Sequence, residues 1–219
     1  MFIKTLVALR KQNKSKMRQI ILLILLSTII SCSPKDEKIG NNLTIKSVFN
    51  SSEIKDLEKI LMFFETQICQ NENGFTENVQ NCYQSFFIRM EKAEEIGSID
   101  LKISFKSQQR LYKEIDSATF NQIWIFNRSW KKNSPDTLKS MTYNYNGKFV
   151  RFLETFAKED EVVKEYYTSF QSAGDIGPSM VASLQKLHKD YDTHDMRIRL
   201  LIAIHYLTLN DQYLRMEKY

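Results

Sequence analysis

The densest cluster of residues that could perform chemistry lies between positions 188 and 194. His188, Asp190, Asp192 and His194 follow one another at every second position. Imidazole nitrogens and carboxylate oxygens are common ligands of divalent cations, so the cluster is a candidate metal site that would suit a metal-dependent hydrolase. It lacks the central Gly and final Glu of an EF-hand loop, and it does not contain the His-Glu-x-x-His signature of zinc proteases.

The same cluster also has a structural interpretation. Asp192 or Thr193 would cap a helix that follows, and Asp195 would complement the dipole of that helix. His205 is set among aliphatic residues, and we expect a buried core side chain with a lowered pKa rather than a general base. The sequence leaves both interpretations of the cluster open.

A second candidate site consists of aromatic residues in the middle of the chain. Trp124, Trp130, Tyr143 and Tyr145 have Arg128 and two lysines nearby. Aromatic rings beside cations can stack on sugar rings or hold a peptide, which predicts a ligand-binding face. Aromatic residues at such spacings also fill protein cores, which is the alternative.

Motifs for nucleotides and for catalytic nucleophiles are missing from the sequence. It contains no Walker loop, no Gly-x-Ser-x-Gly and no Gly-x-Gly-x-x-Gly. We therefore predict no catalytic residue and no cofactor.

The positive charge of the chain is concentrated at its amino terminus. Residues 1–31 hold six of the 31 Lys and Arg residues and no acidic residue, which leaves 25 basic against 26 acidic residues in 32–219. The nearly neutral remainder gives no reason to expect nucleic acid as a partner. The apolar run from Ile20 to Ile30 would extend only about 16 Å as a helix, about half of a bilayer core of about 30 Å. It therefore predicts a secretory signal rather than a membrane-spanning helix.

The end of this apolar run is more specific. Ile29-Ile30-Ser31-Cys32 resembles the lipobox of bacterial lipoproteins, and Lys35-Asp36-Glu37 resembles the surface-export signal of Bacteroidota lipoproteins. The resemblance implies that Cys32 is lipidated on its thiol, freed by cleavage before it and acylated on its new amino group. Two or three acyl chains hold a protein stably on a membrane. Ser33 rather than Asp follows Cys32, which in lipoproteins of this class implies an outer-membrane location, on the periplasmic or the surface face. A plain charged linker is the alternative for 35–37.

With Cys32 assigned to lipid, Cys69 and Cys82 remain as a pair in an oxidising compartment. They flank a polar stretch, and if antiparallel helices flank the same stretch, the two thiols lie at similar depth. A disulfide there would contribute on the order of 3 kcal/mol to stability by closing the loop. Two buried thiols are the alternative.

Apolar spacing predicts a mostly α fold with a helical hairpin, carboxyl-terminal helices and a small β element in the middle. Strict alternation predicts a strand over 98–105, aromatic and β-branched residues favour one over 120–126, and alternation over 141–145 favours another. A buried helix is the alternative for such short apolar runs. Helices are expected over 52–70, 76–95, 108–115, 148–173, from Pro178 onward, and over 196–209.

These patterns divide the chain into a signal peptide over 1–31, a lipidated tether over 32–46 and one α-rich globular domain over 47–219. The function they favour is that of a lipid-anchored envelope protein with a non-enzymatic binding or structural role. Its partners would be the membrane, through the lipid on Cys32, and an unknown envelope protein or glycan. A metal-dependent envelope hydrolase and an immunity-type lipoprotein that neutralises a periplasmic toxin are the alternatives.

Overall fold

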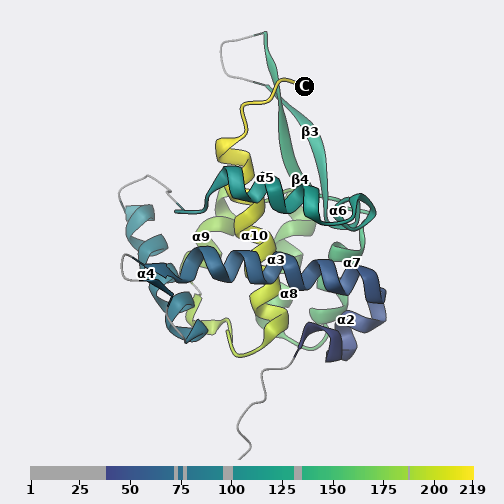
Figure 1. Ribbon diagram of the computed structural model, residues 1–219, viewed down its shortest axis with the longest axis vertical. Helices are drawn as coiled ribbons and strands as arrows, with labels where there is room; N and C mark the ends of the chain where they lie inside the picture. Colours follow the sequence, from purple (N-terminus) through teal and green to yellow (C-terminus); the bar gives the residue numbers. More distant parts are fainter. Residues whose placement is uncertain (1–37, 72–73, 76–77, 96–100, 131–134, 187) are drawn as a thin grey trace, which may run out of the picture. The chain divides into compact units, whose positions relative to one another are not determined.

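The computed structural model describes residues 38–219, apart from 72–73, 76–77, 96–100, 131–134 and 187 (Figure 1). Most of these residues are helical, and a small antiparallel hairpin lies in the middle of the chain, which confirms the expected fold class. Residues 1–37, including Cys32, lie outside the described residues. Among the described helices, none is long and apolar enough to cross a membrane.

The helices and strands follow one another along the chain with short connections. In chain order they are η1 (Ile39–Asn41), α2 (Leu43–Val48), α3 (Ser51–Cys69), β1 (Gln70–Asn71), β2 (Gly74–Phe75), α4 (Val79–Glu95), α5 (Phe105–Glu114), α6 (Ser117–Ile123), β3 (Trp124–Trp130), β4 (Thr137–Tyr143), α7 (Lys148–Phe156), α8 (Glu161–Ala173), α9 (Pro178–Lys186), η2 (His188–Asp190) and α10 (Met196–Leu214).

The folded unit begins at Lys38, before the boundary expected at residue 47. Ile39 and Ile45 are both buried, and the Asn42 side chain accepts a hydrogen bond from the Ile45 N–H to start α2. Part of the expected tether therefore belongs to the core. Two isolated isoleucines in a polar stretch give no periodic signal, which is why the sequence did not predict this.

The helical hairpin around the cysteines is confirmed. α3 and α4 pack against each other, and Cys69 and Cys82 form the expected disulfide with an S–S distance of 2.05 Å. Asn50 caps α3, which begins at Ser51, one residue before the expected start at 52. Its side chain accepts from the Glu53 N–H while the Glu53 carboxylate accepts from the Asn50 N–H, so the helix start is fixed reciprocally.

The strand expected over 98–105 is wrong for the described residues 101–105. Leu101 and Ile103 are buried, so the alternation in the sequence does report burial. However, Ser104 caps α5 by accepting from the Ser107 N–H, and Lys102 has a φ of 56°, which ends an extended run. The segment is a buried connection that leads into a helix.

Two further expectations needed local correction. Phe120 lies in α6 rather than in a strand, because Asp116 caps a helix that continues to Ile123. The helix expected over 148–173 is two helices, α7 and α8, because Asp160 accepts a hydrogen bond from the Val163 N–H and starts a new helix. The expected start of α9 at Pro178 is confirmed.

The core is organised around α10. Figure 1 shows α10 crossing behind α3, and α10 packs against α3, α5 and β4. Its side chains from Ile198 to Asp211 are all buried, whichever way they point. A helix that is buried on every side must be surrounded by other elements.

Candidate functional site

The β3–β4 hairpin carries one face of side chains that becomes exposed toward its tip. Alternate residues of a strand point to the same side, and the pairing places Arg128 opposite Lys139. Trp130, near the tip, is 72% exposed. We refer to this surface as the hairpin face, which consists of Phe126, Arg128, Trp130, Lys139, Glu217 and Tyr219.

Residues 215–219 add a third extended segment beside β4. The Lys139 N–H donates to the Glu217 carbonyl at 2.9 Å, and the Tyr219 N–H donates to the Thr137 carbonyl at 2.9 Å. Figure 1 shows this segment rising beside the hairpin, where it pairs antiparallel with β4. Two backbone hydrogen bonds therefore hold a short extended segment on one edge of the hairpin.

Side chains reinforce this attachment. The Lys139 ammonium lies 2.5 Å from the Glu217 carboxylate, and the Arg128 guanidinium lies 4.7 Å from the centre of the Tyr219 ring. Arg128 thus holds an aromatic ring from across the sheet by a cation–π contact. The 215–219 segment shows which side chains the hairpin face accepts: an acid beside a lysine and an aromatic ring beside an arginine.

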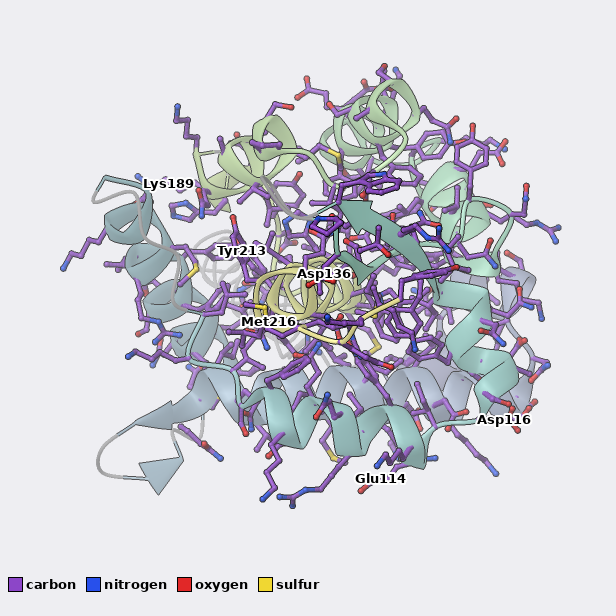
Figure 2. The ribbon with its side chains drawn as sticks, turned by 90° about the horizontal axis from the view of Figure 1, so that it is seen from above. Glu114, Asp116, Asp136, Lys189, Tyr213 and Met216 are labelled. Carbon is purple, nitrogen blue, oxygen red and sulfur yellow. A yellow bond between two sulfur atoms is a disulfide. The ribbon has the colours of Figure 1, made fainter. Side chains whose placement is uncertain are left out.

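A groove of about 420 Å³ opens beside the hairpin face. α5 and α6 line one side of it, and Figure 2 labels Glu114 and Asp116 at the turn that joins these two helices. The Phe120 and Phe126 rings stack with their centres 5.8 Å apart. The aromatic and charged side chains that line the groove are Tyr112, Phe120, Phe126, Lys113, Arg215 and Glu217.

Arg215 is a fixed positive charge in this groove. Its Nε and Nη2 each donate to a carboxylate oxygen of Asp211 at 2.7 Å, and its Nη1 donates to Glu217 at 2.8 Å. The guanidinium also lies 4.6 Å from the centre of the Phe126 ring. Burial is the largest single influence and disfavours the charge, but the hydrogen bonds and charge attraction to Asp211 and Glu217 together outweigh it and raise the Arg215 pKa. Such a group can position a ligand but cannot transfer a proton.

Tyr112 also stays protonated. Burial raises the pKa of its hydroxyl well above the usual value, and the nearby Asp211 carboxylate raises it further. The hydroxyl accepts a hydrogen bond from the Gln108 side chain, whose amide also donates to the Leu207 carbonyl at 2.7 Å. The groove is therefore tied directly to α10.

At its base, the hairpin belongs to the core. Trp124 is fully buried, and its Nε1 donates to the Thr208 hydroxyl of α10 at 2.8 Å. The Tyr143 hydroxyl lies 2.9 Å from the Tyr166 hydroxyl, which in turn lies 2.9 Å from Nδ1 of His205. This buried chain of polar groups anchors both strands to the helices beneath them.

The four aromatic residues predicted as a ligand face therefore do not form one. Trp124 and Tyr143 are core side chains, and Tyr145 donates a hydrogen bond to Gln171 of α8, away from the hairpin face. Only Trp130 lies on the exposed part of that face. The nearby lysines at 131 and 132 lie outside the described residues.

Other members of the site were missed by sequence reasoning. Phe120 and Tyr112 are on helices, and nothing in the sequence shows that the Phe120 ring stacks on Phe126 or that the Tyr112 ring approaches Trp124. A signal did exist for Phe126 and Arg128, which share the parity of Trp130 along one strand. The 215–219 segment is too short to be predicted as a strand from its sequence.

The candidate metal ligands are engaged in local structure. The His188 ring stacks on Phe87 with the ring centres 4.9 Å apart, and its Nδ1 donates to the Gln185 carbonyl at 2.8 Å. Glu91 lies 3.3 Å from the same nitrogen. His188 and His194 both line a second groove, of about 510 Å³, beside α4.

Asp192 and Asp195 act on the backbone. Asp192 accepts a hydrogen bond from the His194 N–H at 2.9 Å, and Asp190 is exposed at the end of η2. Asp195, rather than Asp192 or its neighbour, caps α10 by accepting from the Arg197 N–H at 2.7 Å. Within the part of the chain that the structure describes, no three His, Cys, Asp or Glu side chains are arranged to hold a metal ion.

Comparisons with known proteins give no relative. No family model matches the chain, and neither a curated protein nor a solved structure is significantly similar to it.

Proposed function

We propose that the chain is a lipid-anchored envelope protein whose folded unit is a non-enzymatic binding module, and that the hairpin face is its binding surface. The lipobox-like Ile29-Ile30-Ser31-Cys32 supports the anchor. The arrangement of the hairpin face and its groove supports the binding role.

The observation that carries the binding role is the exposure of Trp130 on a projecting hairpin. A tryptophan that is 72% exposed contributes little to the core and leaves a large apolar surface in water. Tryptophan and arginine are the side chains most often found at the energetic centre of interfaces, and Arg128 lies two residues away on the same face. The surface thus combines the two residue types that bind partners most strongly.

The groove beside this face has the chemistry of recognition. Arg215 is bonded to two carboxylates, and Tyr112 has a raised pKa, so both groups keep one protonation state at neutral pH. General acid–base catalysis needs a group that changes its protonation state near the working pH. Fixed donors and stacked rings instead suit the orientation of a bound side chain.

The anchor is tested by replacing the acylated cysteine. Cys32→Ser removes the thiol that would carry the diacylglyceryl group, so the variant should move from the membrane fraction to the soluble fraction. Two acyl chains are needed for a stable anchor, so the loss should be nearly complete. A variant that still sediments with membranes would show that the anchor is not on Cys32.

The binding surface is tested by photo-crosslinking from single positions in the native cells. A photoreactive residue at position 130 should give a discrete adduct, and Arg128→Glu should abolish it. The control is the same residue in place of Ile88, which is 44% exposed on α4. Equal adducts from both positions would show that the hairpin face is not the binding surface.

A further inference from the structure

The hairpin has a second edge, along β3. In an antiparallel ladder, residues alternate between those that exchange hydrogen bonds with the partner strand and those that point away from it. The Asn144 N–H donates to the Ile123 carbonyl at 2.9 Å, which sets the phase of this alternation. Counting by twos, Ile125, Asn127 and Ser129 bond to β4, while the residues between them turn their backbone groups outward.

The other edge of the hairpin gives an independent check of this phase. Lys139 and Thr137 bond to the 215–219 segment, so they point away from β3. They are the partners of Arg128 and Trp130 in the register. The N–H and C=O groups of Arg128 and Trp130 therefore face away from the hairpin, as do those of Phe126.

These outward groups form an unpaired strand edge. Within the described residues, no hydrogen bond beyond the hairpin is found for the N–H groups of Phe126, Arg128 and Trp130. Residues 127–130 are exposed, so water and other chains can reach the edge. A row of unpaired backbone groups is a template for an added strand.

Given the proposed binding role of the hairpin face, on which this inference rests, we propose that the β3 edge binds an extended segment of a partner protein as an added strand. The segment carries an acidic side chain beside Arg128, with apolar or aromatic side chains two residues to either side, beside Phe126 and Trp130.

The 215–219 segment of the chain itself shows how such a ligand would pair with the hairpin. It pairs with the opposite edge through two backbone hydrogen bonds, and it places Glu217 beside Lys139 and Tyr219 against Arg128. Lys139 and Arg215 are already paired with the carboxylates of Glu217 and Asp211, whereas Arg128 on the β3 edge contacts the Tyr219 ring and, within the described residues, no carboxylate is found beside it. Charge complementarity therefore selects an acidic segment over a basic one.

The apolar positions of the segment also have a place to bind. A side chain next to Phe126 would reach the rim of the groove that Tyr112 and Phe120 line. At the tip, Trp130 offers an exposed ring for a second apolar contact. In strand addition, main-chain hydrogen bonds provide affinity and such alternate side-chain contacts provide specificity.

The experiment uses the full chain in detergent micelles and a synthetic peptide in which valine and threonine alternate around a central glutamate, flanked two residues away by phenylalanine and tyrosine. Binding is measured by fluorescence anisotropy. Two N-methylated versions carry the same number of methyl groups, either on the amides that would face β3 or on the alternate amides. Blocking the facing amides should weaken binding at least about tenfold, while blocking the others should change it by less than about twofold.

A charge exchange tests the side-chain register. Arg128→Glu should weaken binding of the glutamate peptide on the order of tenfold and strengthen binding of the peptide with lysine at the same position. Arg151→Glu, on an exposed position of α7, is the matched control and should leave both affinities unchanged.

Several outcomes would overturn the proposal. Equal loss from both methylation patterns would exclude strand addition, and so would binding of an envelope oligosaccharide without binding of the peptide. A dimer of the chain that is disrupted by Arg128→Glu would assign the edge to a second copy instead. No peptide binding up to about 1 mM, together with a specific adduct from position 130, would refute the added strand while leaving the proposed function intact. Absence of both signals would refute the two together.

Discussion

The two ends of the β3–β4 hairpin use the same residue types for opposite purposes. At the base, Trp124 is fully buried and bonded to Thr208, whereas Trp130 at the tip is 72% exposed. Both indoles lie on the same strand and share its parity, so neither residue type nor alternation separates them. They differ in how far along the strand each lies from α10, because Trp124 contacts this helix and Trp130 is at the far end of β3. The base is part of the core, and the tip is exposed to solvent.

The largest difference in stability between base and tip is expected when each indole is removed in turn. Trp124→Ala should lower the free energy of unfolding by about 3–5 kcal/mol, because it leaves a large cavity in the core. The Thr208 hydroxyl loses the indole donor but still donates to the Ile204 carbonyl. Trp130→Ala should change stability by no more than about 0.5 kcal/mol, since its ring packs on little. Urea denaturation of both variants measures the difference. Comparable losses would mean that the tip is also structural.

Low pH should destabilise the buried residues at the base of the hairpin and leave its exposed tip unaffected. Burial lowers the pKa of His205 to about 3, below the 6.5 of an unfolded histidine. The stabilising contribution of neutral His205 is therefore complete above pH 6.5 and is lost progressively as the pH falls toward 3. At pH 5 the loss should be about 2 kcal/mol.

The measurement compares stability at pH 7 and pH 5 for the parent, for His205→Gln and for His194→Gln. The first variant should lose most of the dependence in this window, while the exposed His194 serves as the control. If all three proteins respond alike, His205 is not the group responsible.

A smaller effect is expected from the loss of the hydrogen bond between Nε1 of Trp124 and the Thr208 hydroxyl. Thr208→Val keeps the shape of the side chain but removes the acceptor for Nε1, which leaves a buried donor unpaired. The cost should be about 1–3 kcal/mol. Thermal unfolding measures it, and Thr168→Val, exposed on α8, is the matched control. A loss no greater than that of the control would show that the indole N–H is satisfied elsewhere.

The smallest expected effect is at the tip side of the sheet. Tyr219→Ala removes the ring on which Arg128 stacks, an exposed cation–π contact of about 0.5–1 kcal/mol. Amide hydrogen exchange at Lys139, whose N–H bonds to Glu217, should become faster while exchange in α10 stays unchanged. Slower or equal exchange would show that Tyr219 does not hold the segment in place.

The helical part of the fold could be predicted because its signals are local. The 3.6-residue spacing over α3 and the nearly all-apolar sequence of 196–209 each suffice alone, and the polar stretch between Cys69 and Cys82 predicts their disulfide. The break between α7 and α8 was not predicted, because Asp160 acts as a cap only through the extended backbone conformation that it adopts in the fold. Capping decides where helices end, and spacing does not reveal it.

The candidate site was harder to predict because it is assembled from distant segments. Arg215 meets Phe126 across 89 positions of sequence, and their contact follows only from where α10 passes through the fold. Sequence reasoning identified aromatic residues with a cation nearby, but it could not tell that Trp124 faces α10. The sequence groups these four aromatic residues by type, whereas in the fold some of them are buried in the core and others are exposed.

The central position of α10 also determines when folding can finish. The apolar faces of α3, α5 and β4 all pack against a helix that is synthesised after them. Until residues 196–211 have emerged from the ribosome, these earlier segments lack their main packing partner, and non-local contacts of this kind form slowly. We expect the growing chain to stay unfolded during synthesis, which would suit the export across a membrane that the proposed envelope location requires.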